Sequence, residues 1–411
     1  MKNHNYRYSK PVAVNERVGE LDMIRGFALF GILLANMPFF GSSFIYSILA
    51  NDRLWTEGYH IFSEGLIHFF ATSKFFTMFS FLFGLGFVIF LERAAEKTAN
   101  PRRLFLRRLF FLLIFGLIHA FGIWYGDILV LYAITGMLLL LFHKARPKTL
   151  IIWAFCLIGL PALLFTFMAF LMYAAREIIP TNIEGISYGT ELAKQAFDAY
   201  SSGSVSKIFA QRAFDYQFMF SGNIFMLPIV LGMFLFGVYI AKTKKHINIS
   251  EHLSFYRKVW IWSLIIGFPV NILFVYSYFL QGPDNMAASL AYTASSMVSG
   301  PALCFFYMTT IVLLVQKGWG ALFVPLKAVG RMALSNYLFQ SIVCTLIFYN
   351  YGLGLFGEVG PLIWLFIAVI LFVVQIILSH MWLKRFKFGP AEWVWRSLTY
   401  GRKQPLKVVS N

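Results

Sequence analysis

The stretch LDMIRGFALFGILLANMPFF, residues 21–40, is long enough for one crossing of a lipid bilayer and consists mostly of apolar residues. A helix needs about 20 apolar residues to span the hydrocarbon core. Similar stretches recur along the chain, in which 59% of the residues are hydrophobic and only 13% are charged. Such a composition leaves too little polar surface for a soluble protein, so the sequence predicts an all-α, polytopic membrane helical bundle.

Ten apolar segments are predicted to cross the membrane within a single transmembrane domain, residues 21–383. The second segment could instead begin near 75, after an amphipathic interfacial helix at 59–72, and the fourth could cross only half of the bilayer. Two short tails, 1–20 and 384–411, lie outside this domain. The segments lie at about 21–40, 68–91, 108–125, 128–143, 149–174, 217–241, 259–280, 287–315, 329–350 and 361–383.

Lysine and arginine are concentrated in the tails and in alternate loops, which sets the predicted orientation. Of 35 such residues, 27 lie in the two tails and in every second loop between the predicted spans. Cytoplasmic loops retain basic residues, so both termini are predicted to be cytoplasmic. The net charge of +17 is then explained by topology and by attraction to the anionic headgroups of the lipid bilayer, and no nucleic-acid partner is expected.

Two basic, aromatic segments lie next to predicted spans. In PRRLFLRRLF, residues 101–110, anchoring to lipid headgroups is the favoured interpretation, and binding of a phosphorylated cytoplasmic substrate is the alternative. In GPAEWVWR, after the last span, Glu392 and Arg396 form an i,i+4 pair beside Trp393 and Trp395. Interfacial anchoring is favoured there as well.

The longest outward segment, about 175–216, contains Pro180 and several glycines, together with a helical pattern in TELAKQAFDAY. It is predicted to form an outward cap with a short helix, which serves as a connector or as a lid over a substrate. Cys156, Cys304 and Cys344 all lie in predicted spans. Their positions predict neither a disulfide framework nor a metal site.

Polar residues at membrane depth are candidates for function, because each costs up to about 3 kcal/mol near a helix centre. Asp22 and Arg25 lie three residues apart and share one helix face, and Gly26 permits close approach of a neighbour. They form either an ion pair that fixes the helix or a polar lining, in which Asp22 holds Arg25 against a phosphate or carboxylate. Asn36, nearer the outer end, is either a packing residue or a catalytic group.

His119 and Asp127 lie at the outward ends of two consecutive spans, separated by a tight turn at YGD. A histidine titrates near neutral pH and can act as a general base, and a carboxylate beside it can fix its tautomer and raise its basicity. This pair is the candidate catalytic centre. The alternative is that His119 is a hydrogen-bonded interior residue and that Asp127 caps a helix.

The motif VGRMALSNYLFQ begins the ninth span with Arg331, on the cytoplasmic side as Arg25 is in the first span. The two arginines could together neutralise a diphosphate or an acyl-carrier phosphate. Asn336 and Gln340 are four residues apart and line one face of the helix. They are candidates for substrate binding, with helix packing as the alternative.

Several motifs, in this order along the chain, resemble the YeiB-like family of bacterial polytopic membrane proteins. The resemblance covers about residues 17–400 and implies a multi-pass protein of the bacterial cytoplasmic membrane. Proteins of this family have been labelled as candidate transporters. The motifs are RVGELDMIRGFALFGILLANMPFF, KFFTMFSFLFGLGF, RRLFFLLIFGLIHAFGIWYGDILVLYAITG, VGRMALSNYLFQ and GPAEWVWR.

The opening LDMIRGFAL...LLAN is also similar to the start of transmembrane acyltransferases of the heparan-alpha-glucosaminide N-acetyltransferase type. That resemblance implies transfer of an acyl group from cytoplasmic acyl-CoA to an acceptor across the membrane. The family's histidine in the following loop has no match, because His60 and His68 stand at a different spacing, and His119 becomes the substitute candidate. The matching positions are Asp22, Arg25 and Asn36.

Three functions are compatible with these observations. The leading hypothesis is an acyltransferase that uses acyl-CoA as donor and a small molecule, a glycan or a lipid-linked compound as acceptor. A proton-coupled transporter of a small amphipathic solute would use Asp22, His119 and Asp127 for proton coupling. A noncatalytic scaffold would bind a partner through its basic inner face. A homodimer is left open.

Overall fold

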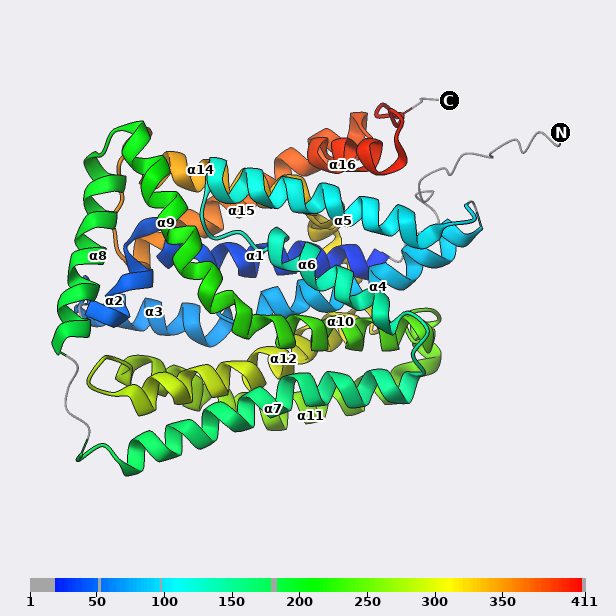
Figure 1. The fold of residues 1–411 in the computed structure, drawn as a ribbon. Helices are drawn as coiled ribbons and strands as arrows, with labels where there is room; N and C mark the ends of the chain where they lie inside the picture. Colours follow the sequence, from blue (N-terminus) through cyan, green and yellow to red (C-terminus); the bar gives the residue numbers. More distant parts are fainter. Residues whose placement is uncertain (1–18, 51–52, 97, 179–182, 409–411) are drawn as a thin grey trace.

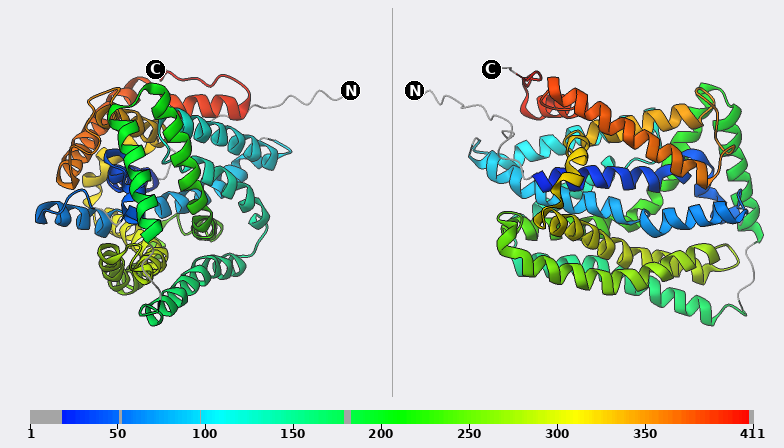
Figure 2. Two further views of the ribbon diagram at one scale, coloured as in Figure 1. Left: turned by 60° about the vertical axis from the view of Figure 1, so that its left-hand side comes forward. Right: turned by 180° about the vertical axis from the view of Figure 1, so that it is seen from behind.

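The computed structural model describes residues 19–50, 53–96, 98–178 and 183–408. Within these ranges the chain is helical, and extended pairing is limited to two isolated bridges. The long helices run roughly along one axis and form one bundle (Figure 1), and the view from behind in Figure 2 agrees. The predicted all-α polytopic membrane bundle is confirmed. Most of the predicted tail 1–20 lies outside the described residues.

Eight helices of the described chain are long and apolar enough to cross a membrane, and two shorter apolar helices lie among them. Together they cover all ten predicted segments, although the fourth and ninth are shorter than a full crossing. The long helices are α1 (Gly19–Gly41), α3 with α4 (Gly58–Phe70, Lys74–Ala95), α5 with the π-helical turn η2 (Pro101–Ile118, His119–Ile123), α7 (Pro147–Ala174), α9 with η4 and α10 (Val205–Asn223, Ile224–Met226, Leu227–Lys242), η5 with α11 (Ile249–His252, Leu253–Leu280), α12 (Met286–Gln316) and α15 (Pro361–Arg385). The remaining elements are α2 (Phe44–Ala50), α6 with η3 (Leu129–Leu139, Leu140–Phe142), α8 (Ile183–Ser202), η6 (Trp319–Phe323), α13 (Val324–Arg331), α14 (Ala333–Phe348) and α16 (Pro390–Tyr400).

The outer helices expose large apolar side chains, as expected for a surface that faces lipid. Leu160 and Phe170 of α7 are 64% and 65% exposed, and Phe366 of α15 is 61% exposed. In water a surface of this kind would favour association, whereas in a bilayer it contacts hydrocarbon. α1 begins, and α16 lies, at the same end of the bundle, which is the end that carries the basic loops (Figure 1).

A break in the backbone divides the second long segment into α3 and α4. Ser73 has a positive φ of 71° there. Buried donors satisfy the carbonyls at the end of α3: Lys74 Nζ lies 2.8 Å from the oxygen of His68. Asn271 Nδ2 lies 3.0 Å from the oxygen of Phe69. The alternative boundary, with a separate helix before residue 75, is therefore the one observed.

Two glycines allow α4 and α10 to pack with their backbones in close contact. A Cβ atom at Gly84 would overlap the carbonyl oxygen of Phe234, and a Cβ at Gly237 would overlap that of Phe81. Small residues at helix contacts are the usual means of close packing in membranes, where no hydrophobic effect drives helices together. The position of α4, which lines the cavity described below, depends on this contact.

We expect Gly84→Ala to destabilise the protein by about 1–3 kcal/mol, because a methyl group placed against a backbone carbonyl forces the two helices apart. Gly86 is the matched control, since it lies on the same helix and a Cβ there meets no atom within 4 Å. Gly86→Ala should leave stability unchanged or raise it, as alanine favours a helix over glycine by about 1 kcal/mol. Thermal unfolding in detergent measures the stability of both variants. Equal changes in their melting temperatures would refute the packing argument.

The end of the bundle opposite the basic loops is covered by α2 and α8 (Figure 1, left). The carboxylate of Asp215 in α9 joins these elements, because it accepts hydrogen bonds from Tyr46 Oη at 2.6 Å and from Tyr200 Oη at 2.5 Å. The segment predicted as an outward cap, 175–216, thus contains α8 and the first part of α9. Its role as connector or lid stays a prediction.

Candidate functional site

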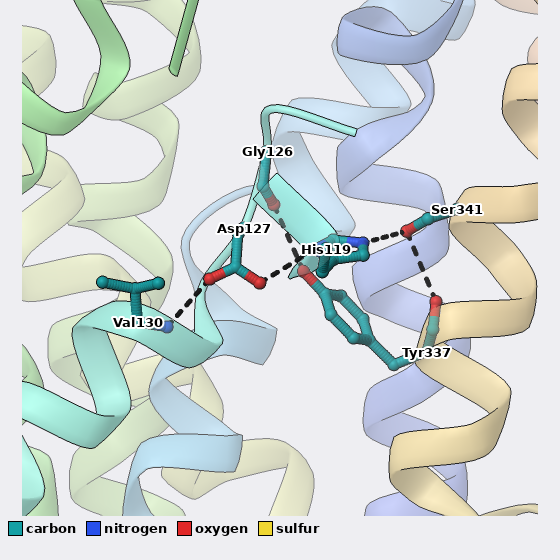
Figure 3. A network of polar contacts seen from close by, with 6 residues as sticks. All are labelled: His119, Gly126, Asp127, Val130, Tyr337 and Ser341. Atoms are coloured by element: carbon teal, nitrogen blue, oxygen red, sulfur yellow. Dashed lines mark hydrogen bonds and ion pairs between the residues drawn. The ribbon is translucent and has the colours of Figure 1, made fainter. Parts of the chain in front are cut away.

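His119, Asp127 and Ser341 form a hydrogen-bonded chain in the interior of the bundle (Figure 3). Nδ1 of His119 lies 2.8 Å from Oδ2 of Asp127, and Nε2 lies 2.8 Å from Oγ of Ser341. All three side chains are buried. The structure therefore brings the two predicted residues together and adds a serine hydroxyl at the opposite edge of the imidazole ring.

The turn that carries Asp127 is fixed by the same carboxylate. Its Oδ1 accepts a hydrogen bond of 2.8 Å from the backbone nitrogen of Val130, which caps the start of α6. Gly116 of α5 permits this approach, since a Cβ there would lie 2.9 Å from Oδ1 of Asp127. Asp127 is thus both a helix cap and the partner of His119, so the two interpretations of its sequence position are compatible.

The π-helical turn η2, which begins at His119, is held by a residue of the predicted outward cap. Nη1 of the buried Arg212 donates to the oxygen of Gly122 at 2.7 Å and to that of Phe121 at 3.3 Å. A π-turn interrupts the regular helical bonding pattern and frequently occurs at functional sites. Arg212 therefore stabilises the irregular helix end from which the histidine projects.

A cavity of about 280 Å³ lies between α1, α4, α5, α6, α13, α14 and α16. Its wall contains four arginines, two tyrosines and one glutamate, together with many leucine and phenylalanine side chains. It therefore combines a strongly basic part with an apolar part. The arginines are Arg25, Arg108, Arg331 and Arg396.

Two glycines bring the arginines of α1 and α13 to this cavity. A Cβ at Gly26 would overlap the backbone of Leu326, and a Cβ at Gly330 would overlap the carbonyl oxygen of Asp22. The two helices can approach this closely only without side chains at these positions. Arg25 and Arg331, which the sequence suggested could act together on a phosphate, consequently line one cavity.

The positive charge of the cavity is only partly neutralised by carboxylates of the described chain. Nη1 of Arg25 lies 2.8 Å from Oδ1 of Asp22. Arg331 donates one long hydrogen bond of 3.5 Å from Nη2 to the oxygen of Lys387, and its Nε has no partner among the described residues. Buried donors without a partner are costly, so these groups favour an anionic ligand.

Arg108 and Arg396 complete the basic part of the cavity. Cζ of Arg108 lies 3.8 Å from the ring centroid of Trp395, a cation–π contact that orients the guanidinium without neutralising it. Burial lowers the pKa of Arg396, and the charge of Arg25 adds to this effect, while a phenol and a carboxyl of α16 oppose it. Within the described chain, no group of three His, Cys, Asp or Glu side chains could hold a metal ion.

Glu392 faces the cavity but directs its carboxylate to the start of α14. Oε1 accepts hydrogen bonds from the backbone nitrogens of Leu334 at 2.7 Å and Ser335 at 3.1 Å. The positive end of a helix stabilises such a charge. Burial raises the pKa of Glu392. In the described chain this helix cap takes the place of the expected i,i+4 ion pair with Arg396.

Tyr337 separates the cavity from the buried histidine. Its side chain lines the cavity, and its ring centroid lies 4.9 Å from that of His119. Its hydroxyl donates to the oxygen of Gly126 at 3.2 Å, in the turn that carries Asp127 (Figure 3). The arginine-lined cavity and the hydrogen-bonded chain of His119 are therefore adjacent, and the ring of Tyr337 contacts both.

Three other predicted site residues lie outside this arrangement. Nε2 of Gln340 donates to Oε1 of Gln375 at 2.9 Å, and Nδ2 of Asn336 donates to Oγ of Ser379 at 3.0 Å. These bonds join α14 to α15 and favour the helix-packing alternative. Asn36 is half-buried and makes no side-chain hydrogen bond to another described residue.

His60 and His68, the histidines that follow the first span, lie in α3 and pack against tyrosine rings. The ring of His68 stacks on that of Tyr278 at a centroid distance of 3.6 Å, and His60 packs beside Tyr59 at 4.3 Å. Neither of them joins the hydrogen-bonded chain of His119. The substitution of His119 for the missing loop histidine stays a prediction.

Sequence reasoning missed Ser341 and Arg396 as site residues, and it considered Arg108 only within the basic segment 101–110, where binding of a phosphorylated substrate was the alternative to headgroup anchoring. Arg108 had a usable signal, because it lies three residues after the buried Phe105 and four before the buried Leu112, on the inward face of α5. Arg396 was assigned to the segment after the last span, for which anchoring at the membrane interface was the favoured interpretation. Ser341 lies 222 residues from its histidine partner, so no local pattern could indicate that contact.

Eight long apolar helices around a buried polar centre define a multi-pass α-helical membrane protein. The chain is 39% identical to the uncharacterized protein YxaH of Bacillus subtilis (strain 168), over 97% of its own length and 98% of that protein. It is 26% identical to the uncharacterized protein YeiB of Escherichia coli (strain K12), over 93% of its length and 96% of that protein. The family described as protein of unknown function (DUF418) matches residues 240–402.

The chain therefore belongs to the YeiB-like family of membrane proteins. No solved structure matches it. The names of these two relatives state no activity, so the similarity of the first helix to acyltransferases stays a prediction from the sequence.

Proposed function

We propose that the protein is a membrane acyltransferase, which takes an acyl group from acyl-CoA at the cytoplasmic side and transfers it to an extracytoplasmic or lipid-linked acceptor. The observation that carries this proposal is the cavity with four arginines at one part of its wall and Tyr337, the neighbour of His119, at another. Three features of its lining support the proposal: guanidinium groups suited to phosphates, apolar side chains suited to an acyl chain, and a ring that contacts His119.

The arginines would bind the phosphates of the donor. Guanidinium groups form paired, charge-assisted hydrogen bonds with phosphate oxygens, and the buried Nε of Arg331, which has no partner among the described residues, is available for such a bond. Asp22 would hold Arg25 in position through their 2.8 Å contact. The leucine and phenylalanine side chains of the same wall would pack against the acyl chain.

His119 would act as the general base, with Asp127 as its positioning residue. The carboxylate faces Nδ1, which fixes the proton there and leaves the lone pair of Nε2 free to accept a proton. Such a base contributes about 10²–10⁴-fold to a rate by proton transfer. Asp127 is the only carboxylate that contacts the imidazole within the described residues, and its charge favours the tautomer with the proton on Nδ1.

Binding of acetyl-CoA to detergent-purified protein tests the proposal directly. We expect saturable binding, and an affinity at least about 10-fold higher than that for the acetyl thioester of N-acetylcysteamine, which lacks the nucleotide and its phosphates. Release of free CoA thiol over time then measures turnover. Equal affinity for the two thioesters, or no binding by folded protein, would refute acyl-CoA as the donor.

The second candidate function is proton-coupled transport of a small amphipathic solute, which one observation favours. The helix break between α3 and α4 has Lys74 buried beside it, and broken helices at membrane depth are a feature of many transporters. Uptake or efflux in proteoliposomes driven by a proton gradient, without release of CoA thiol from acetyl-CoA, would favour this function over acyl transfer.

A further inference from the structure

We infer that Ser341 is the nucleophile of a two-step reaction, in which the acyl group passes through an ester on Ser341 Oγ before it reaches the acceptor. This inference rests on the proposed acyltransferase function and names the residue that carries the acyl group. It follows from the order Ser341, His119, Asp127 in one buried hydrogen-bonded chain, with contacts of 2.8 Å on both sides of the imidazole.

The hydrogen-bonding geometry makes the Ser341 hydroxyl a donor to the histidine. Asp127 accepts a hydrogen bond from Nδ1–H, so Nε2 is the acceptor that faces Ser341 Oγ at 2.8 Å. The other contact of this hydroxyl, to the backbone oxygen of Tyr337, is longer, at 3.4 Å. A serine in a helix usually bonds to the carbonyl one turn before it, as Ser80 does at 2.8 Å.

This arrangement is the one that activates a serine in unrelated hydrolases and acyltransferases. A hydroxyl is a weak nucleophile at its ordinary pKa and needs an adjacent base, which a third group orients. The triad is recognised by geometry and roles, independently of fold and of chain order. Here α14 supplies the serine, η2 the histidine, and the following turn the aspartate.

The position of Ser341 suits a residue that relays the acyl group inward from the donor. Tyr337, one turn earlier in α14, lines the arginine cavity, so the acyl carbonyl would reach Ser341 after passing this ring. A covalent ester would let CoA leave before the acceptor arrives. The donor and the acceptor, which are on opposite sides of the membrane in the proposed function, would then never need to occupy the site together.

Both steps balance without any oxidant, reductant or further reactant. In the first, Ser341 Oγ attacks the thioester carbonyl and gives its proton to His119 Nε2; the carbon–sulfur bond breaks, and CoA leaves as a thiol with that proton. In the second, the acceptor hydroxyl or amine gives its proton to Nε2 and attacks the ester. The bond between the acyl carbon and Oγ breaks, and Oγ takes the proton back.

Mass spectrometry of protein incubated with acetyl-CoA alone tests the inference, because no acceptor is needed for the first step. We expect a gain of one acetyl group on the peptide that contains Ser341, together with a burst of CoA thiol equal to the amount of protein. Ser341→Ala should lose both. The matched control is Thr345→Ala, one turn further on, where a buried hydroxyl donates within its own helix, at 3.0 Å to Ile342 O.

Two chemical controls separate the ester from accidental acylation of a thiol. Neutral hydroxylamine removes acetyl groups from cysteines, including the nearby Cys344, and leaves a serine ester in place. If Ser341→Ala does not fold, Ser341→Cys serves instead, and its acetyl group should become sensitive to neutral hydroxylamine. An acetyl group found on His119 would overturn the inference.

The outcomes distinguish this inference from the proposed function. Steady release of CoA thiol by the wild type, with no adduct and with an unchanged rate in Ser341→Ala, would overturn the serine ester and leave acyl transfer intact. No binding and no release by folded wild-type protein would overturn both. An adduct that forms on Ser341 and decays on addition of an acceptor would establish both.

Discussion

Asp127→Asn should leave the protein folded while it lowers the rate of CoA thiol release from acetyl-CoA by about 10²–10⁴-fold. Asparagine is as good a helix cap as aspartate, so the bond from the Val130 nitrogen and the turn it fixes should persist. The amide lacks the charge that holds the proton on Nδ1 of His119. The histidine then loses the charged partner that orients its ring and keeps the proton on Nδ1.

Stopped-flow measurement of thiol release reports the loss of activity, and thermal unfolding of the same preparations reports any loss of stability. His119→Ala should lose activity to a similar extent, because it removes the base itself. The matched histidine control is His60→Ala, a buried imidazole that makes no contact with Asp127 or Ser341 in the described structure. A rate in Asp127→Asn within about twofold of the wild type would exclude Asp127 as a positioning residue, and the same result for His119→Ala would exclude His119 as the base.

The fold could be predicted from sequence because each membrane helix is determined by residues that are adjacent in the chain. The length of LDMIRGFALFGILLANMPFF and of the segments like it follows from bilayer thickness, and each helix satisfies its own backbone groups. The break near Ser73 was predicted only as an alternative, because the apolar pattern continues on both sides of Thr72–Lys74, and the backbone φ of 71° at Ser73 is not a property that periodicity reports. The shortness of α14 likewise follows from the preceding helix α13, which ends at Arg331.

The candidate site was predicted most directly where its members lie close in the chain. His119 and Asp127 are eight residues apart, so the tight turn between them already placed them together. For Arg25 and Arg331 the sequence suggested joint action and a close approach at Gly26, but it did not identify the neighbouring helix, which is α13 with Gly330 at the contact. Asn336 and Gln340 share a face as the sequence predicted, but that face turns to α15 and to the oxygen of a leucine in α1.

Arg108→Ala should weaken acetyl-CoA binding by about 10-fold to 100-fold, because a charge-assisted hydrogen bond to phosphate contributes roughly 1.5–3 kcal/mol. The guanidinium lies in the cavity wall and is oriented by Trp395 at 3.8 Å. Arg103→Ala, on the same helix, removes the same charge from an exposed side chain and should change the affinity little.

Salt dependence then distinguishes a direct phosphate contact from a general surface field. Exposed charges are screened within about 10 Å at 0.1 M ionic strength, whereas a contact inside a cavity is screened less. The affinity ratio between wild type and Arg108→Ala should therefore persist when salt is raised, while any small effect of Arg103→Ala should disappear. Equal losses in the two variants, removed together by salt, would mean that the basic run on α5 attracts the donor only through its net charge. In that case the cavity would lose its assignment as the donor site, and the broken helix at Ser73 would become the better starting point for assigning function.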